Sequence, residues 1–414
     1  MEYKLTNCIL CNNTKLIKLI TFNSTPLGDS FKKNKNEAMS LNRYNLDLMM
    51  CNKCKHIQLS TIVAPEDVYD EEYLYTTDIS HGLSEHFQKS ANNIISKFNV
   101  TKNDLVIEIG SNKGIMLNEF KKNNINILGI EPAKYAAECA TQNGIDTIND
   151  FFNINIANKI IKTDYNIKVI LANNVMANIP NLNEFFQAIE ILLRKDDGVF
   201  IFETSYAKDV FEKNLIDTIY HEHISYFSLY SLHKELEKFG LKLYDAEHIK
   251  PKGGSIRGYI SKINSPKYST TDRLNQLLKQ EIESNFWNNK IDKNIKVLEN
   301  DINEYIKFLY KQNHKIICYG ASVGCTTMIY NLGLQKCDIL LDDNKLKIGK
   351  YSPGLGIKVE DSNYIYTENI QYVIVLAWRY IEQIMQKHTK FLKKGGKFIL
   401  IDLPNNKLVE YKNG

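Results

Sequence analysis

The chain has 414 residues, of which 43% are hydrophobic and 24% are charged, a globular composition that is long enough for two or three domains with separate cores. Its formal net charge is +4 and its basic residues are dispersed, so the composition gives no reason to expect nucleic acid as a partner. No apolar run is long enough to span a membrane and the first residues lack a signal-peptide core, which predicts a cytoplasmic protein with no membrane partner.

The N-terminal region carries two Cys-x-x-Cys pairs, Cys8 with Cys11 and Cys51 with Cys54. Each pair offers two thiolates to one metal ion, and four thiolates complete the closed tetrahedron of a structural zinc site. In a reducing compartment, pairs with this spacing indicate a metal and not disulfides. The sequence therefore predicts a structural Zn²⁺ ion with no open position for catalysis. Free thiols that meet this spacing by coincidence are the alternative.

After this region, short apolar runs alternate with stretches of helical spacing. The apolar runs predict buried parallel strands at 105–107, 127–130, 169–171 and 199–202. Helices are predicted between them at 115–122, 135–142 and 182–194. This alternation indicates a doubly wound α/β sheet. A charged helical stretch over 270–311 then precedes a second α/β unit, with strands near 315–320, 338–341, 372–376 and 398–401.

The first predicted strand leads into a glycine loop, Gly110 to Gly114, which opens a helix. Glycines let the backbone approach a ligand closely at the carboxyl end of a strand. Polar or acidic residues then follow the next three strands: Glu131 suits ribose hydroxyls, an acid with an aromatic ring suits adenine, and Asn173 suits a methionine ammonium group. This order is that of S-adenosylmethionine-dependent methyltransferases, with a generic nucleotide fold as the alternative. The predicted cofactor-binding residues are Glu108, Gly110, Ser111, Asn112, Gly114, Glu131, Pro132, Asp150, Phe151, Asn173 and Asn174.

The run Tyr220-His221-Glu222-His223 places two imidazoles, a carboxylate and a phenol together. Histidine titrates near neutral pH, and a neighbouring acid can fix its tautomer, so the run has the groups needed for proton transfer. The i, i+4 spacing of helical zinc ligands is absent. Residues i and i+2 share one side of a strand, which favours an extended or turn segment with one histidine facing a cleft. A structural histidine pair bonded to the backbone is the alternative.

Two further segments are candidates for contact with a substrate. Lys252 to Arg257 combines glycine amides with a guanidinium suited to a diphosphate, although a glycine hairpin turn fits equally well. Tyr73 and Tyr75 offer phenols between the cysteine module and the sheet, or form an edge strand. A second glycine loop over 320–324 is either a working nucleotide site or a scaffold.

Together these motifs resemble the zinc-containing nucleotide-sugar C-methyltransferases, which methylate C-3 of 4-keto-deoxysugars. The resemblance spans nearly the whole chain, including the paired cysteines, 26–30, 108–114, 220–223, 253–257 and 319–322. It implies a zinc-binding substrate module over 1–80, a methyltransferase domain over 81–265 and a C-terminal Rossmann-like domain over 266–414. It also implies S-adenosyl-L-methionine and structural Zn²⁺ as cofactors, and a nucleotide-linked sugar as substrate. Two positions depart from the family pattern: Lys113 replaces an aspartate and Asn178 replaces a histidine.

The mechanism that follows from this resemblance uses His223, oriented by Glu222, to remove the C-3 proton. Tyr220, with help from Tyr75 or Asn178, donates a hydrogen bond to the developing enolate oxygen. The predicted substrate-binding residues are Tyr73, Tyr75, His221, Lys252, Gly254 and Arg257. Methylation of a sugar oxygen or nitrogen, a decayed methyltransferase that only binds, and a nicotinamide-dependent reductase are the alternatives. We expect a monomer or a weak dimer.

Overall fold

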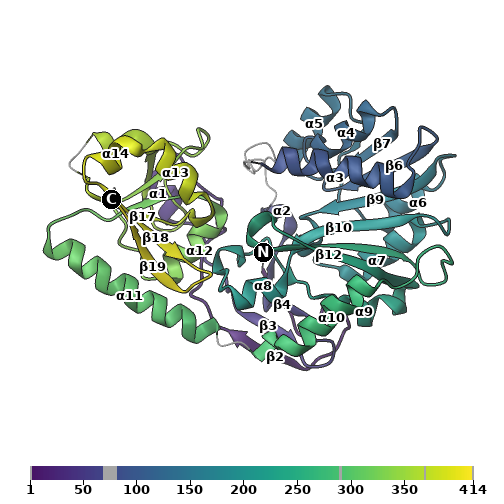
Figure 1. Ribbon diagram of the computed structural model, residues 1–414, viewed down its shortest axis with the longest axis horizontal. Coiled ribbons are helices and arrows are strands. Elements are labelled where there is room, and N and C mark those ends of the chain that lie inside the picture. The colour runs from purple at the N-terminus through teal and green to yellow at the C-terminus, as the bar shows by residue number, and fades with distance from the viewer. Residues whose placement is uncertain (1, 69–81, 289–290, 368–369, 413–414) are drawn as a thin grey trace.

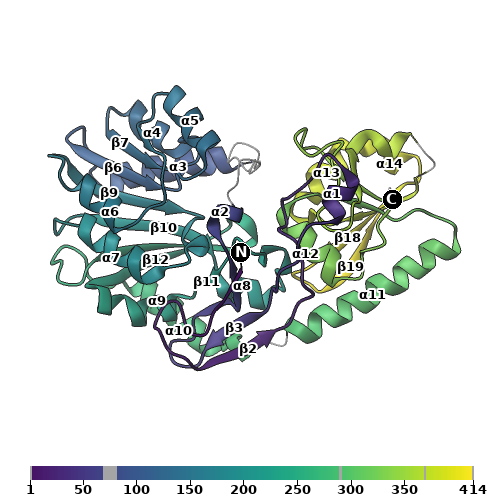
Figure 2. The same cartoon turned by 180° about the vertical axis from the view of Figure 1, so that it is seen from behind.

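The computed structural model describes residues 2–68, 82–288, 291–367 and 370–412. Two α/β lobes lie side by side, and the N-terminal strands run along the base between them (Figures 1 and 2). The predicted fold class is confirmed: a cysteine-bearing N-terminal module, a Rossmann-like sheet and a second α/β unit. None of the helices in these ranges is long and apolar enough to cross a membrane.

The first lobe is built on a seven-stranded sheet with the order β12-β13-β10-β9-β6-β7-β8. Its strands are β6 (Asp104–Ile109), β7 (Asn126–Ile130), β8 (Thr147–Ile148), β9 (Asn166–Asn173), β10 (Val199–Ser205), β12 (Leu241–Ile249) and β13 (Ser255–Lys262). Strands β6 to β10 are parallel, whereas β13 runs antiparallel to both β10 and β12. The strand order reverses between β6 and β9, and such a switch point leaves a crevice at the carboxyl ends of the strands.

Both faces of this sheet are covered, as the near-continuous apolar strands predict. Alternate residues of β6 point to opposite faces, so Val106 packs into one core cluster and Ile107 into another. The helices of the lobe are α3 (Leu83–Phe98), α4 (Ile115–Lys122), α5 (Lys134–Gln142), α6 (Ile154–Ile160), α7 (Leu182–Leu192), α8 (Ala207–Glu212) and α9 (Leu229–Glu235). Helices α3 and α4 cover the Val106 face, and α6 and α7 cover the Ile107 face.

The second lobe repeats this plan with a six-stranded sheet in the order β16-β15-β14-β17-β18-β19. Its strands are β14 (Ile317–Tyr319), β15 (Ile339–Asp342), β16 (Lys358–Asp361), β17 (Tyr372–Val375), β18 (Lys397–Asp402) and β19 (Lys407–Tyr411). Its helices are α12 (Val323–Asn331), α13 (Ile381–Lys387) and α14 (Thr389–Lys393), preceded by α10 (Asp272–Ser284) and α11 (Ile291–Lys311). The switch point lies between β14 and β17, so this unit also has a crevice at its carboxyl edge.

The N-terminal module is tied to both lobes. It comprises β1 (Glu2–Lys4), β2 (Leu16–Ile20), β3 (Leu48–Cys51), β4 (Ile57–Leu59), β5 (Thr61–Val63), α1 (Lys35–Met39) and α2 (Pro65–Val68). Strand β11 (Ser225–Tyr226), which directly follows the Tyr220–His223 segment, pairs with β4 and completes the module's sheet. On the other side, the amide of Gly354 donates to the carbonyl of Ala38 in α1. The predicted domain boundaries stay a prediction, and the first of them falls at 80/81, outside the described residues.

Candidate active site

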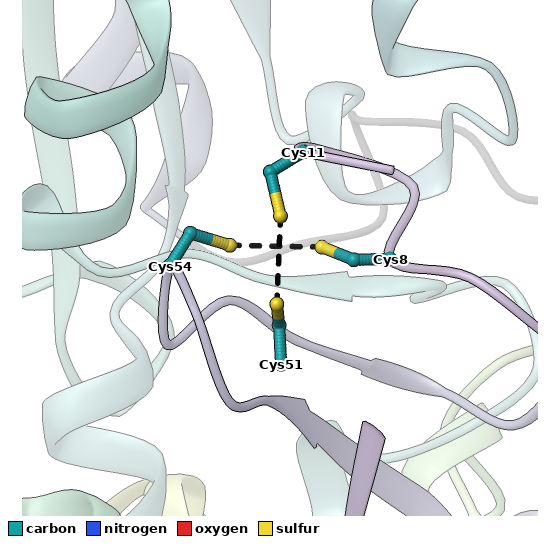
Figure 3. A group of neighbouring side chains, drawn as sticks. All are labelled: Cys8, Cys11, Cys51 and Cys54. Carbon is teal, nitrogen blue, oxygen red and sulfur yellow. Dashed lines mark hydrogen bonds between the residues drawn. The ribbon is translucent and has the colours of Figure 1, made fainter. Parts of the chain in front are cut away.

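The four cysteines predicted to bind zinc meet at one point. Their Sγ atoms all lie within 4.8 Å of one another, and the Cys8–Cys54 and Cys11–Cys51 pairs are 3.6 and 3.4 Å apart. Figure 3 shows the four sulfurs pointing toward a common centre. Sulfurs bound at 2.3 Å in a tetrahedron would be separated by about 3.8 Å, so the set fits a zinc ion. Four thiolates leave no position for a substrate, which gives this metal a structural role.

A cavity of about 1160 Å³ opens at the carboxyl edge of the seven-stranded sheet. It lies where the first lobe, the N-terminal module and the second lobe meet, because Pro65, His86 and Trp378 all line it. Seven of the predicted cofactor-binding residues also line it: Gly110, Asn112, Glu131, Pro132, Phe151, Asn173 and Asn174. The switch point of the sheet thus coincides with the cavity, as expected for a nucleoside cofactor.

The glycine loop has the close geometry that a cofactor cradle needs. Gly110 has φ +66°, and a Cβ added there would lie 2.1 Å from a Val175 methyl group. Glu131 holds the loop in place, because its two carboxylate oxygens accept the amides of Asn112 and Ala133, each at 2.8 Å. Its carboxylate also reaches the cavity, where a ribose would lie. These features fit S-adenosylmethionine.

Glu108 lies beneath this cradle and is almost fully buried. One of its oxygens accepts from Asn173 at 3.1 Å, and the other has no hydrogen-bond partner among the described residues. Burial, reinforced by the charges of Glu131 and Glu203, raises the pKa of Glu108 to about 8. A cationic ligand nearby would restore the ionised form, which is what the methionyl end of S-adenosylmethionine offers.

This carboxyl group predicts a pH dependence of cofactor binding. The ionised form attracts a cation, so affinity for S-adenosylmethionine should rise as pH increases toward about 8, until the α-ammonium group of the cofactor loses its own proton. We expect roughly a tenfold gain between pH 6.5 and 8.5 by calorimetry. The Glu108→Gln variant, which cannot ionise, should show a flat profile. A wild-type dissociation constant that stays constant over this range would contradict the assignment.

Three predicted cofactor residues that do not line the cavity, Ser111, Gly114 and Asp150, play supporting parts. Ser111 is buried, and its Oγ lies 2.5 Å from where a Cβ on Gly129 would be, so it packs the loop onto β7. Gly114, with φ +75°, caps the start of α4. The carboxylate of Asp150 accepts the amide of Phe151. Phe151 is 39% exposed and lines the cavity, which makes its ring available to an adenine face.

The Tyr220–His223 segment forms a turn, and His223, but not His221, lines the cavity. His223 is buried, with its Nε2 2.8 Å from the hydroxyl of Tyr220 and its Nδ1 2.8 Å from the carbonyl oxygen of Thr218. A carbonyl only accepts, so Nδ1 carries the proton and Nε2 accepts the Tyr220 hydroxyl. Burial lowers the pKa of His223 to about 3, which keeps the ring neutral.

Neighbouring predicted residues differ in how they relate to the cavity. Glu222 and Asn178 line it, and Asn178 belongs to the short turn η2 (Met176–Asn178). His221 turns toward the N-terminal module, with its ring edge-on to Tyr44 at a centroid distance of 5.7 Å. The sequence predicts that Glu222 orients His223. In the structure the two ring nitrogens of His223 face Tyr220 and Thr218, so the backbone carbonyl of Thr218 orients the ring instead.

The segment over 252–257 lies partly at the cavity and partly in the core. Lys252 lines the cavity, in the turn η5 (Pro251–Gly253). Gly254 is needed for close packing, because a Cβ there would lie 1.8 Å from the carboxylate of Asp209. Arg257 is only 6% exposed and donates from Nε to Glu203 at 2.7 Å, so its guanidinium serves a buried ion pair. Tyr73 and Tyr75 lie outside the described residues.

Sequence reasoning missed several residues that the fold brings to the site. His86 on α3 lines the cavity and bonds through Nε2 to Glu203 at 2.7 Å, which couples it to Arg257. Asp217 and Arg379 pair across the two lobes, and both line the cavity. A histidine within a helix or an aspartate in a short turn carries no local signal of such contacts. Only the three-dimensional arrangement reveals them.

A second cavity of about 520 Å³ lies at the carboxyl edge of the six-stranded sheet. It contains the second glycine loop, the acidic end of β15 and four cationic side chains: Lys347, Lys350, Arg379 and Lys387. Asp342 repeats the role of Glu131, because its carboxylate accepts the amides of Ala321 and Asn344 at 2.6 and 2.8 Å. The two cavities share lining residues: Asp217, Glu222, Ser322, Val323, Arg379 and Tyr380.

Comparison with known proteins agrees with this geometry. Residues 8–69 match a zinc binding domain, residues 83–246 a methyltransferase domain, and residues 250–404 the C-terminal domain of C-methyltransferases. The C-methyltransferase NovU of Streptomyces niveus is 26% identical over 407 residues, covering 97% of this chain and 96% of NovU. The chain is an S-adenosylmethionine-dependent methyltransferase related to NovU, with a zinc-binding module and a C-terminal domain of the C-methyltransferase type. Both cofactors inferred from the sequence, S-adenosylmethionine and zinc, are thereby confirmed.

Solved structures match this methyltransferase only in part. An S-adenosylmethionine-dependent methyltransferase from Clostridium acetobutylicum is 12% identical, with a TM-score of 0.35 and coverage of 43% of this chain and 92% of that one. A second, from Archaeoglobus fulgidus, is 13% identical with a TM-score of 0.35, and covers 43% of this chain and 94% of that one. Both similarities are too low to support conclusions about function.

Proposed function

We propose that the enzyme methylates carbon C-3 of a 4-keto sugar linked to a nucleotide. One observation carries this proposal: the Tyr220–His223 hydrogen-bonded pair lines the same cavity as the cofactor cradle. A neutral imidazole beside a phenol is suited to removing a proton from carbon next to a carbonyl. Such protons are acidic enough for a positioned base, whereas an ordinary C–H bond is not.

The pair divides the chemistry of enolisation between two atoms 2.8 Å apart. His223 Nε2 has the lone pair that accepts the C-3 proton, while the C–H electrons move to the carbonyl oxygen. For this to happen the Tyr220 hydroxyl first turns from Nε2 to the substrate carbonyl oxygen, which frees the Nε2 lone pair; its hydrogen bond to that oxygen is worth a few kcal/mol when it strengthens in the transition state. The carbonyl of Thr218 keeps Nδ1 protonated, and the negative charge that develops on the enolate beside the ring offsets the burial that lowers the pKa of His223 and disfavours the imidazolium.

The remaining residues of the first cavity align the reactants. Bound S-adenosylmethionine supplies a methyl group that its positively charged sulfur has already activated. Glu131, Gly110 and Asn173 hold the cofactor from the sheet side, and His223 approaches from the turn before β11. Asn178 offers a further hydrogen bond to the sugar, although an amide cannot move a proton at neutral pH. Alignment of this kind accounts for much of the rate in a two-substrate reaction.

The nucleotide end of the substrate has a place in the second cavity. This cavity adjoins the first, and its three lysines provide the cations that a diphosphate requires, whereas the guanidinium of Arg379 is already paired with Asp217. The lysines thus take the part that the sequence suggested for Arg257. Asp342 or Asp343 would meet ribose hydroxyls, as Glu131 does in the first unit. The second glycine loop is then a working site in this proposal, and not a scaffold alone.

The location and assembly of the protein are part of the same proposal. None of the eight cysteines forms a disulfide, which suits the reducing cytoplasm. A substrate that spans both cavities of one chain needs no partner subunit, consistent with a monomer or weak dimer. Size-exclusion chromatography with light scattering measures the oligomeric state directly.

Incubation with isotope-labelled S-adenosylmethionine and a panel of 4-keto nucleotide sugars tests the proposal. We expect mass spectrometry to find one substrate that gains a labelled methyl group, while the matching 4-hydroxy sugars stay unmodified. Binding of the cofactor by calorimetry, without transfer to any member of the panel, would favour a protein that only binds. Transfer to the 4-hydroxy sugars would favour methylation of oxygen.

A further inference from the structure

The turn that carries His223 is held by the C-terminal lobe. Thr327 on α12 donates from its hydroxyl to the carbonyl of Ile219 at 2.6 Å. Asp217, in the turn η3 (Ile216–Thr218), accepts from the indole of Trp378 at 3.0 Å and pairs with Arg379. Trp378 and Arg379 form the turn η8 (Trp378–Tyr380), which follows β17. The contacts therefore come from two separate elements of that lobe.

The backbones of the two lobes also touch at this turn. A Cβ built on Gly324, near the start of α12, would lie 1.9 Å from the carbonyl oxygen of Asp217. A separation that short is impossible, so residue 324 must lack a side chain for η3 to lie where it does. The side chain of Asp217 is 8% exposed and that of Arg379 is 25% exposed, so the ion pair between them is largely desolvated.

These contacts involve the two residues that flank Thr218, whose carbonyl orients His223. Thr218, whose carbonyl oxygen accepts from His223 Nδ1, lies between Asp217 and Ile219 in the chain. The residue on each side of Thr218 is thus bonded to the C-terminal lobe. Tyr220, the partner of Nε2, comes directly after Ile219. A shift of this turn would move the carbonyl, the imidazole and the phenol together.

We propose that the C-terminal lobe positions the catalytic turn through Thr327, Gly324 and Asp217, so that this lobe is required for proton removal as well as for substrate binding. The inference rests on the proposed function of His223. Misplacement of a base by about 1 Å can lower a rate by about 100-fold. The three residues are positioning residues, since they act through Thr218 and His223.

The Thr327→Val variant tests this without touching either cavity. It keeps the side-chain shape, removes the bond to Ile219, and affects a fully buried residue that lies outside the lining of both cavities. We expect kcat to fall about tenfold, and exchange of the sugar C-3 proton with deuterated water to fall by the same factor. The KM for S-adenosylmethionine should stay within about twofold.

Asp217→Ala should lower kcat further, by about 100-fold. Asp217→Asn should have an intermediate effect because it keeps an acceptor for Trp378.

Thr326→Val is the matched control. Thr326 is the preceding residue of α12, is also buried, and donates to the carbonyl of Gly28 at 2.8 Å instead of to the catalytic turn. It should lower the melting temperature about as much as Thr327→Val but leave kcat within about twofold. Equal kcat losses in the two threonine variants, or a kcat near wild type in both Thr327→Val and Asp217→Ala, would overturn the proposal. If His223→Asn also retains proton exchange, the fault lies in the proposed function; if only the Thr327 and Asp217 variants retain it, the fault lies here.

Discussion

Replacing His223 by asparagine should abolish exchange of the sugar C-3 proton and lower methyl transfer by about 10²- to 10⁴-fold. Asparagine can still accept a hydrogen bond from Tyr220 but cannot take up a proton at neutral pH. The cofactor cradle is built from β6, β7 and β9, far along the chain from this turn, so the dissociation constant for S-adenosylmethionine should stay near the wild-type value. Deuterium exchange followed by nuclear magnetic resonance, with calorimetry for the cofactor, measures both.

His233→Asn provides the control for this variant, because it makes the same substitution at an exposed position on α9. It should leave exchange and turnover unchanged. Tyr220→Phe separates the two members of the pair: proton removal should slow because the developing oxyanion loses its donor, while exchange stays measurable. Full exchange in His223→Asn would show that another group removes the proton.

Loss of the zinc ion should have the second large effect, this time on stability. The apparent binding free energy of structural zinc in small modules is about 10–16 kcal/mol, so chelation or Cys51→Ser should unfold the N-terminal module. Strand β4 of that module pairs with β11, which lies just after the turn Tyr220–His223. We therefore expect methyl transfer to be lost, while the first lobe, built on the seven-stranded sheet, keeps its affinity for S-adenosylmethionine. Metal analysis, thermal unfolding and calorimetry on the same samples test this.

Cys139→Ser is the matched control, since Cys139 is only partly buried, lies on α5 and takes no part in the cysteine cluster. It should retain one zinc per chain, together with wild-type melting behaviour and activity. A Cys51→Ser protein that stays folded in the N-terminal module and fully active would contradict a structural role for the metal.

Local patterns explain which parts of this enzyme could be predicted. The paired cysteines and the glycine loop are short motifs whose spacing fixes their geometry, so both appear in the structure as expected. The alternation of apolar strands with amphipathic helices likewise predicts two sheets, and both are present in the structure. Glu131 could be placed because ligands of an open parallel sheet bind outside the carboxyl ends of its strands, and Glu131 directly follows β7.

The contacts that the sequence could not predict depend on register and on distant elements. Arg257 follows two glycines and suits a phosphate by chemistry, yet the pairing of β13 with β10 sets it opposite Glu203. The carbonyl of Thr218 can orient His223 only because a short turn brings it back to the ring. Strand β11 has two residues, too few for any periodic signal, and still pairs with β4 of the module just after the Tyr220–His223 segment.

The position of the transferred methyl group tests the central claim most directly. The enzyme should be incubated with ¹³C-methyl-labelled S-adenosylmethionine and the 4-keto nucleotide sugar that it accepts, and the product examined by carbon–proton nuclear magnetic resonance. We expect the labelled methyl to be bonded to C-3 of the sugar ring, with the C-3 proton absent from the spectrum. A labelled methyl bonded to oxygen or nitrogen, with that proton retained, would contradict the account.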